Sequence, residues 1–228
     1  MDHENSMEAA KTRILAAALA HVAFDGWSQA TLDAALSDSG VSPALGPALF
    51  PRGGIDLAAA YHQAGDQAMR DALAACDLTT LRYTERVALA VKLRLQAADK
   101  ELVRRGTTLF SLPHHAAEGS RLIWASADAI WQALGDSSTD LAWYTKRATL
   151  SAVYSATVLF WLGDHSDDNV DTWAFLDRRL ANVMQFEKAK AALRDNPLAK
   201  TLLAGPNKLL ARIRAPHPAQ DLPGQTKR

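Results

Sequence analysis

The amino-acid sequence predicts an all-α protein, and three observations support this prediction. Alanine and leucine dominate the 228 residues, whereas glycine and proline, with 12 and 9 copies, are sparse, and this composition favours helix. Apolar side chains recur at helical spacing along most of the chain, and no alternating pattern of useful length indicates a strand. The length fits one large domain or one domain with a small appendage.

The first predicted helix covers residues 7–23. Ile14, Ala18 and Val22 follow one another at intervals of four residues, so they share one face of this helix. Gly26 ends it, because glycine is favoured just beyond a helix C-terminus. The chain is therefore expected to open with a helix that packs along one side.

Two short helices are predicted next. The second covers residues 31–36, and Ser28 is placed to act as its N-cap. The third begins at Pro43, a residue favoured at the first helical position, with Ser42 as its cap. A helix, a short helix, a glycine turn and another short helix have the layout of a helix-turn-helix. We assign residues 1–54 to this module.

Six longer helices are predicted downstream, each bounded by glycine, proline or polar residues. The helix at 141–162 is apolar on nearly all sides, so it is expected to be buried. Residues 55–193 are assigned to one helical body and residues 194–228 to a separate tail. The predicted helices are 55–75, 81–98, 100–112, 118–134, 141–162 and 171–193.

The charge of the helix-turn-helix argues against DNA recognition. Joined to a larger helical body, this module resembles the plan of the TetR-type regulators. A helix that reads DNA needs Arg, Lys, Asn or Gln at base edges, and phosphate contacts need Lys or Arg. Residues 28–51 contain no Lys or Arg, whereas Asp33 and Asp38 would repel phosphate. The module is therefore interpreted as degenerate, and no nucleic-acid partner is expected.

The net charge is zero but unevenly distributed. Residues 188–228 hold nine Lys and Arg and two Asp, so an acidic body precedes a basic tail. Apolar tail residues share a helical face flanked by cations, which suits a membrane interface. A solvated end and a helix docked on the body remain alternatives. The residues expected to meet the membrane are Leu198, Leu202, Lys208, Leu209, Arg212 and Ile213.

No run of about 20 apolar residues is present, so no transmembrane helix is predicted. The single cysteine, Cys76, excludes an internal disulfide and a Cys-rich metal site, and it favours a reducing, cytoplasmic setting. The acidic N-terminal residues argue against a secretory signal. With its basic tail, the protein is expected to be cytoplasmic and peripheral to the inner membrane.

Residues 139–186 concentrate aromatic side chains, and Trp143 and Tyr144 stand beside Lys146 and Arg147. Aromatic anchors ringed by polar groups suit a binding surface. No nucleophile, base and oxyanion donor occur together nearby, so the sequence predicts binding and not catalysis.

Neither histidines nor acidic clusters form a convincing metal site. His114 and His115 point in different directions on a helix and lack a second ligand cluster. The acidic loop at 164–171 lacks the glycine and the closing glutamate of a calcium loop. No metal and no cofactor are therefore expected.

Four segments carry a resemblance to a known family: FPRGGIDL at 50–57, SLPHHAAEGSRLIW at 111–124, DLAWYTKRATLSAVY at 140–154 and DTWAFLDRRL at 171–180. They closely resemble the ubiquinone-biosynthesis accessory proteins, the ninth Coq protein and its bacterial relatives, over roughly residues 8–214. The resemblance implies a TetR-like fold without DNA binding, a homodimer, and a buried cavity for an isoprenoid quinone precursor or a phospholipid. It further implies a non-catalytic protein that presents this precursor to a di-iron quinone hydroxylase.

The resemblance also implies site residues. The patch that contacts the hydroxylase corresponds to Asp140, Trp143 and Tyr144, although Trp143 could instead fold onto the core and Asp140 could be only an N-cap. From the residues alone, a solid core is the expectation, because interiors are close-packed. The alternative function is a ligand-responsive TetR-type regulator. The residues expected to line a lipid cavity are Leu109, Leu122, Trp131, Tyr154, Phe160 and Trp161.

Overall fold

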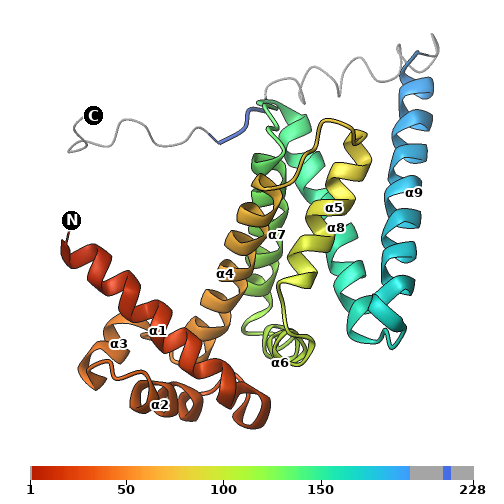
Figure 1. Ribbon diagram of the computed structural model, residues 1–228. Helices are drawn as coiled ribbons and strands as arrows, with labels where there is room; N and C mark the ends of the chain where they lie inside the picture. Colours follow the sequence, from red (N-terminus) through yellow and green to blue (C-terminus); the bar gives the residue numbers. More distant parts are fainter. Residues whose placement is uncertain (1, 196–212, 217–228) are drawn as a thin grey trace, which may run out of the picture.

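The computed structural model describes residues 2–195 and 213–216, and every regular element in that part of the chain is a helix (Figure 1). The all-α prediction is therefore confirmed. Nine α-helices and two 3-10 turns follow one another along the described chain. They are α1 (Asp2–Asp25), α2 (Gln29–Asp38), η1 (Pro43–Leu45), α3 (Gly46–Leu49), α4 (Gly54–Ala74), α5 (Tyr83–Gln96), α6 (Lys100–Phe110), α7 (Ala116–Ala133), α8 (Leu141–Leu162), η2 (Asp167–Asn169) and α9 (Val170–Asp195).

The helices α1, α2 and α3 form a small N-terminal unit (Figure 1). Ile14, Ala18 and Val22 on α1 are fully buried, as their spacing predicts. The Ser28 hydroxyl accepts a hydrogen bond from the Thr31 amide at 3.2 Å, so the predicted N-cap of α2 is confirmed. This unit has a hydrophobic core of its own, built on α1, α2 and the start of α4.

The predicted third helix is wrong in form. The chain makes the 3-10 turn η1 and then the single helical turn α3, and Ser42 makes no side-chain cap hydrogen bond. Pro47 explains the break, because proline supplies no backbone N–H and its ring collides with the carbonyl four residues earlier. The segment that would read DNA in a helix-turn-helix is therefore short and irregular.

Helix α4 joins the N-terminal unit to the C-terminal bundle. It starts at Gly54, where a Cβ would lie 2.3 Å from the backbone of Trp27, so only glycine allows this approach. Leu57 belongs to the N-terminal core, whereas Met69 and Leu73 belong to the second core. The expected boundary at residue 54 thus coincides with the start of a helix that both cores share.

The C-terminal bundle packs α4, α5, α7, α8 and α9 around the second core (Figure 1). Helix α8 begins and ends where the sequence predicts, with Asp140 as N-cap and Gly163 after its last residue. It is not buried on all sides, however, because Leu159 is 63% exposed and Phe160 37%. Helices α7 and α9 cover only part of the α8 surface, so Leu159 stays largely exposed, and Phe160 is exposed on one side although it contacts α9.

Most residues of the predicted membrane-associating tail lie outside the described residues, namely Leu198, Leu202, Lys208, Leu209 and Arg212. Ile213 is described and partly exposed. The Ala215 amide donates to the Thr139 carbonyl at 2.9 Å, which attaches this short piece beside the start of α8. Among the helices that the structure describes, none is both long and apolar enough to span a bilayer.

Candidate functional site

A cavity of about 310 Å³ lies between α4, α5, α6, α7 and α8. Its inner wall is formed by buried side chains, among them Leu95, Leu122 and Tyr154. Ser111 and Leu159 are exposed members of its lining, so they mark the side on which the cavity opens. The lining is mainly apolar, and a mainly apolar lining is typical of sites for small hydrophobic ligands.

The structure places three of the six predicted lipid-binding residues beside a cavity. Leu122 and Tyr154 line the 310 Å³ cavity. Trp131 lines a second hollow of about 900 Å³, which is bordered by α5, α8 and α9. These three residues, expected in one cavity, therefore lie beside two separate spaces.

The other three predicted lipid-binding residues border neither space. Leu109 packs against the N-terminal core. Phe160 stacks on Phe175 of α9, with ring centroids 4.5 Å apart. Trp161 follows Tyr154 by two helical turns, which carries it about 10 Å along α8 and past the cavity. There it is buried under the Lys100 ammonium group, 5.4 Å from the ring centroid.

A cluster of polar side chains closes the inner end of the cavity, and we call it the polar end: His62, Asp66, Arg94, Ser126 and Tyr154. The Arg94 guanidinium donates to Asp66 Oδ1 at 2.6 Å and to the His62 carbonyl at 2.9 Å. The Ser126 hydroxyl donates to the same Asp66 oxygen at 2.7 Å. Both charged side chains are almost completely buried, so each compensates the other.

Glycine makes room for this cluster. Gly65 lies on α4 beneath Arg94, and a Cβ there would lie 2.5 Å from a guanidinium nitrogen. Any larger residue at this position would push the arginine away from Asp66. The local sequence of α4 thus permits the buried ion pair.

His62 is neutral at the polar end. Its Nε2 lies 2.7 Å from Ser126 Oγ and 3.2 Å from the Leu122 carbonyl oxygen. Burial, with the nearby Arg94 charge, lowers the pKa of His62 to about 4. Burial also raises the pKa of Tyr154, which hydrogen-bonds with Ser126. At neutral pH the polar end therefore holds one balanced ion pair and two neutral rings.

Ser126, His62 and Asp66 lie together, but they do not have the arrangement of a catalytic triad. In a triad the histidine accepts the serine proton and the carboxylate holds the other ring nitrogen. Here Ser126 donates its proton to Asp66, and His62 Nε2 faces the Leu122 carbonyl, which can only accept. No histidine of the described chain accepts from the serine hydroxyl, and the Asp66 carboxylate is already paired with Arg94, so the arrangement suits recognition of a ligand group.

Of the polar end, only Tyr154 was predicted from the sequence. Its members come from four helices, and Arg94 is 28 residues from Asp66. Neither His62 nor Asp66 lies in the aromatic-rich segment 139–186 that directed the sequence prediction of binding. One signal was available: His62 and Asp66 are four residues apart on α4 and so share a helical face.

A second candidate region lies at the start of α8, where the sequence predicts a partner contact. The Asp140 carboxylate accepts a hydrogen bond from the Ala142 amide at 2.9 Å, so it caps the helix. Trp143 is half-buried and meets Trp124 and Tyr144 at ring-centroid distances of 5.9 and 4.8 Å. The three predicted residues thus lie together, and their role in partner binding stays a prediction.

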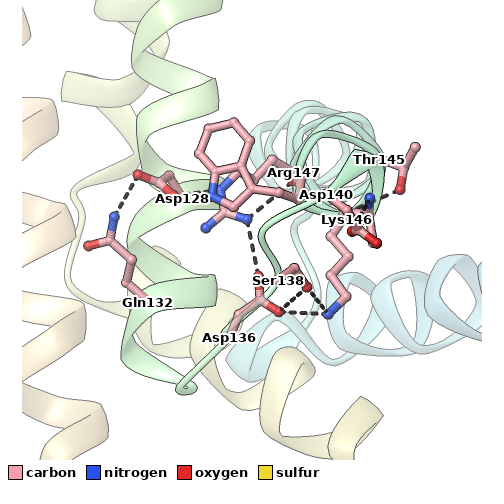
Figure 2. Close-up of polar contacts among 10 residues, drawn as sticks. Asp128, Gln132, Asp136, Ser138, Asp140, Thr145, Lys146 and Arg147 are labelled. Atoms are coloured by element: carbon pink, nitrogen blue, oxygen red, sulfur yellow. Dashed lines mark hydrogen bonds and ion pairs between the residues drawn. The ribbon is translucent and has the colours of Figure 1, made fainter. Parts of the chain in front are cut away.

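Arg147 supports this region from below (Figure 2). Its buried guanidinium donates to Asp128 at 2.5 Å and to Asp136 at 3.1 Å, and it lies 4.0 Å from the Trp143 ring centroid. Lys146 also donates to Asp136, at 2.6 Å. Burial by itself would raise the pKa of Asp136, but hydrogen bonds from Lys146, Ser138 and Arg147 outweigh it and hold that pKa below its ordinary value.

The family model and the curated relatives that match this chain carry the same family name. Residues 116–187 match the sequence model of the COQ9 family. The human ubiquinone biosynthesis protein COQ9, mitochondrial, is 32% identical over 192 residues, which are 80% of this chain and 60% of that protein. COQ9-B of Xenopus laevis is also 32% identical, over 80% of this chain and 65% of its own length. The chain thus spans about 60% of the length of the curated relatives it matches.

A solved structure confirms the fold. The TetR transcriptional regulator from Nitrosomonas europaea ATCC 19718 aligns with a TM-score of 0.60 at 19% sequence identity. The alignment covers 75% of this chain and 95% of the regulator. The predicted TetR-like, all-α fold is therefore confirmed, and at this identity the likeness concerns the fold alone.

Proposed function

Residues 116–187 belong to the COQ9 family, and from that premise we propose that this chain is a non-catalytic, lipid-binding accessory protein of ubiquinone biosynthesis. The observation that carries the proposal is the mainly apolar cavity. Its inner wall includes Leu122 of α7 and Tyr154 of α8, and both residues lie within the matched range 116–187. Curated relatives are named ubiquinone biosynthesis proteins, which supports an isoprenoid quinone precursor as the ligand.

The cavity dimensions suit the head and the first part of the tail of such a precursor. Each methylene removed from water stabilises the complex by about 0.8 kcal/mol, so a short stretch of tail already contributes substantially. The remaining tail would leave through the open side beside Leu159, where the protein surface is apolar. The ligand would then be passed to a di-iron quinone hydroxylase through the patch of Asp140, Trp143 and Tyr144.

The test is to fill the cavity. Ser155 lines the cavity on α8, whereas Ala152, three residues earlier, is exposed and borders neither of the two spaces described above. We expect Ser155→Trp to remove co-purified isoprenoid lipid, as measured by native mass spectrometry and lipid extraction, and Ala152→Trp to retain it. Equal lipid content in the two folded variants would contradict the proposal.

A homodimer and the absence of DNA binding are part of the proposal. Leu159, Val170 and Met184 leave apolar surface exposed on α8 and α9, which favours an interface between two copies. Sedimentation equilibrium that returns only the 24.7 kDa monomer would contradict the dimer. The absence of Lys and Arg in residues 28–51 disfavours a transcriptional regulator, and a gel shift with genomic DNA would overturn that conclusion.

A further inference from the structure

The hydrogen bonds of the polar end fix the proton on His62. A carbonyl oxygen can only accept, so the Leu122 oxygen, 3.2 Å from His62 Nε2, requires the proton on that nitrogen. The contact with Ser126 supports the same assignment. The Ser126 hydroxyl donates its hydrogen bond to Asp66, so its oxygen can accept one from His62 Nε2 at 2.7 Å. In a neutral imidazole with Nε2 protonated, Nδ1 carries no proton and is an acceptor.

Among the described residues this acceptor is unpartnered, and it is not sealed from the space around it. Nδ1 of His62 makes no hydrogen bond with the described residues, and it is not among their sealed, unpartnered polar atoms. His62 lines the cavity and keeps 20% of its side chain exposed. A lone acceptor in a mainly apolar cavity gains most from a ligand that donates a hydrogen bond.

The charges of the polar end oppose an anionic ligand. The Arg94 guanidinium is bonded to Asp66 and to the His62 carbonyl, so its charge is already balanced. A phosphate would need an unbalanced cation, and the polar end offers none to it. A neutral hydroxyl needs no such partner.

We propose that the polar end selects a phenolic head group, whose hydroxyl donates a hydrogen bond to His62 Nδ1 while the ring and tail fill the apolar part of the cavity. This inference rests on the proposed function, since it requires that the cavity binds an amphipathic ligand. It adds the orientation, head inward, and the chemistry, a hydroxyl donor. Quinone carbonyls and ethers have no hydrogen to donate to His62 Nδ1, and a phosphate carries a charge that the polar end does not balance.

The experiment compares two probes that differ only in whether the phenolic oxygen carries a hydrogen or a methyl group. Full-length protein, stripped of lipid, is titrated with 4-hexylphenol and with 4-hexylanisole, its methyl ether, by calorimetry. One neutral hydrogen bond predicts that the phenol binds about three- to ten-fold more tightly. Equal affinity of the two probes, or tighter binding of hexyl phosphate, overturns the phenol inference and leaves the lipid cavity standing. No binding of any probe overturns both proposals.

A variant and a spectroscopic measurement identify the acceptor. His62→Phe keeps a flat ring and removes Nδ1, so we expect it to bind phenol and ether equally. Gln63→Phe, at the exposed neighbouring position on α4, should keep the preference for phenol. With ¹⁵N-labelled histidine in the wild type, the phenol should shift one unprotonated ring-nitrogen resonance and the ether should not. This measurement holds even if His62→Phe does not fold, and an unchanged spectrum would overturn the inference.

Discussion

Two arginines, Arg94 and Arg147, are buried almost completely, and each lies against carboxylates. An unpaired charge in the interior is costly, so each arginine fixes the position of its partners. Arg94 holds Asp66 at the polar end of the cavity, and Arg147 holds the Trp143 ring above it at the start of α8. At the residue scale, both candidate regions are therefore organised around a buried guanidinium.

We expect Arg147→Met to destabilise the fold by about 2 to 3 kcal/mol. Asp128 and Asp136 would lose their buried partner, although Lys146 would still pair with Asp136. Breaking a buried ion pair lowers the free energy of unfolding more than breaking a surface pair does. Urea unfolding measures the change. Arg82→Met is the control, because Arg82 pairs with Glu85 at the exposed surface and its loss should change the free energy of unfolding much less. Similar losses for the two variants would contradict this account.

His62 should make stability depend on pH. Its folded-state pKa is about 4, below the ordinary 6.5, so the unfolded chain binds more protons between these values. Neutral His62 therefore makes its full contribution to the free energy of unfolding above about pH 6.5, and this contribution is lost as the pH falls toward 4. Between pH 7.5 and 5, wild type should lose about 2 kcal/mol more than His62→Phe in urea unfolding. Parallel pH profiles of the two proteins would show that His62 is not held neutral.

At the element scale, the accuracy of the sequence predictions follows local signals. Helix α8 matched its predicted range because Asp140 caps one end and Gly163 follows the other. The third helix failed because Pro47 prevents a regular continuation, and its effect was underestimated. Local chemistry thus specifies where helices start and stop, within a few residues.

The cavity could be foreseen only in part. Leu122 and Tyr154 were identified through a family resemblance and line it. Which turn of a helix faces the cavity depends on how the helices pack against one another, so Trp161, which the resemblance implies as a wall residue, is not part of the cavity lining. The polar end depends on contacts among four helices, and no single segment contains them.

The start of α8 should contact the hydroxylase through Trp143. Its ring is half-buried between Arg147 and Trp124, so truncation removes a rigid, pre-positioned anchor. We expect Trp143→Ala to abolish co-purification with the di-iron hydroxylase while the circular dichroism spectrum is retained. Trp173→Ala, which truncates another half-buried tryptophan on α9, serves as the control. Equal recovery of the hydroxylase with both variants would refute the patch.

Asp140 combines a capping role with a possible contact role, and two substitutions separate them. Asn caps helices as well as Asp, whereas Ala does not. Asp140→Ala should therefore lower stability by about 1 kcal/mol and Asp140→Asn should not, as measured by thermal unfolding. If the carboxylate charge also meets the partner, both variants should bind the hydroxylase more weakly. Full binding by Asp140→Asn would leave Asp140 with the capping role alone.

At the scale of the whole molecule, the described part of the basic tail and the proposed partner patch lie at one end of the bundle. Residues 188–228 carry nine Lys and Arg and only two Asp. The described piece 213–216 lies beside the start of α8, where the Tyr144 hydroxyl donates to the Arg214 carbonyl at 3.2 Å. The end of α9 lies at the same end of the bundle (Figure 1). A membrane contact through this tail would therefore hold the patch of Asp140, Trp143 and Tyr144 near the lipid surface.

Removing residues 196–228 should lower binding to vesicles that contain anionic lipid by at least about ten-fold, because each Lys or Arg near such a surface contributes about 1 kcal/mol. Added salt should weaken the wild-type binding, and vesicles of neutral lipid should show little difference between the two proteins. Lys208→Glu combined with Arg212→Glu keeps the contacts of residues 213–216 and tests charge alone. Vesicle co-sedimentation measures all three proteins. Unchanged binding by both variants would assign membrane contact to another surface, and it would separate collection of the ligand from the end that meets the hydroxylase.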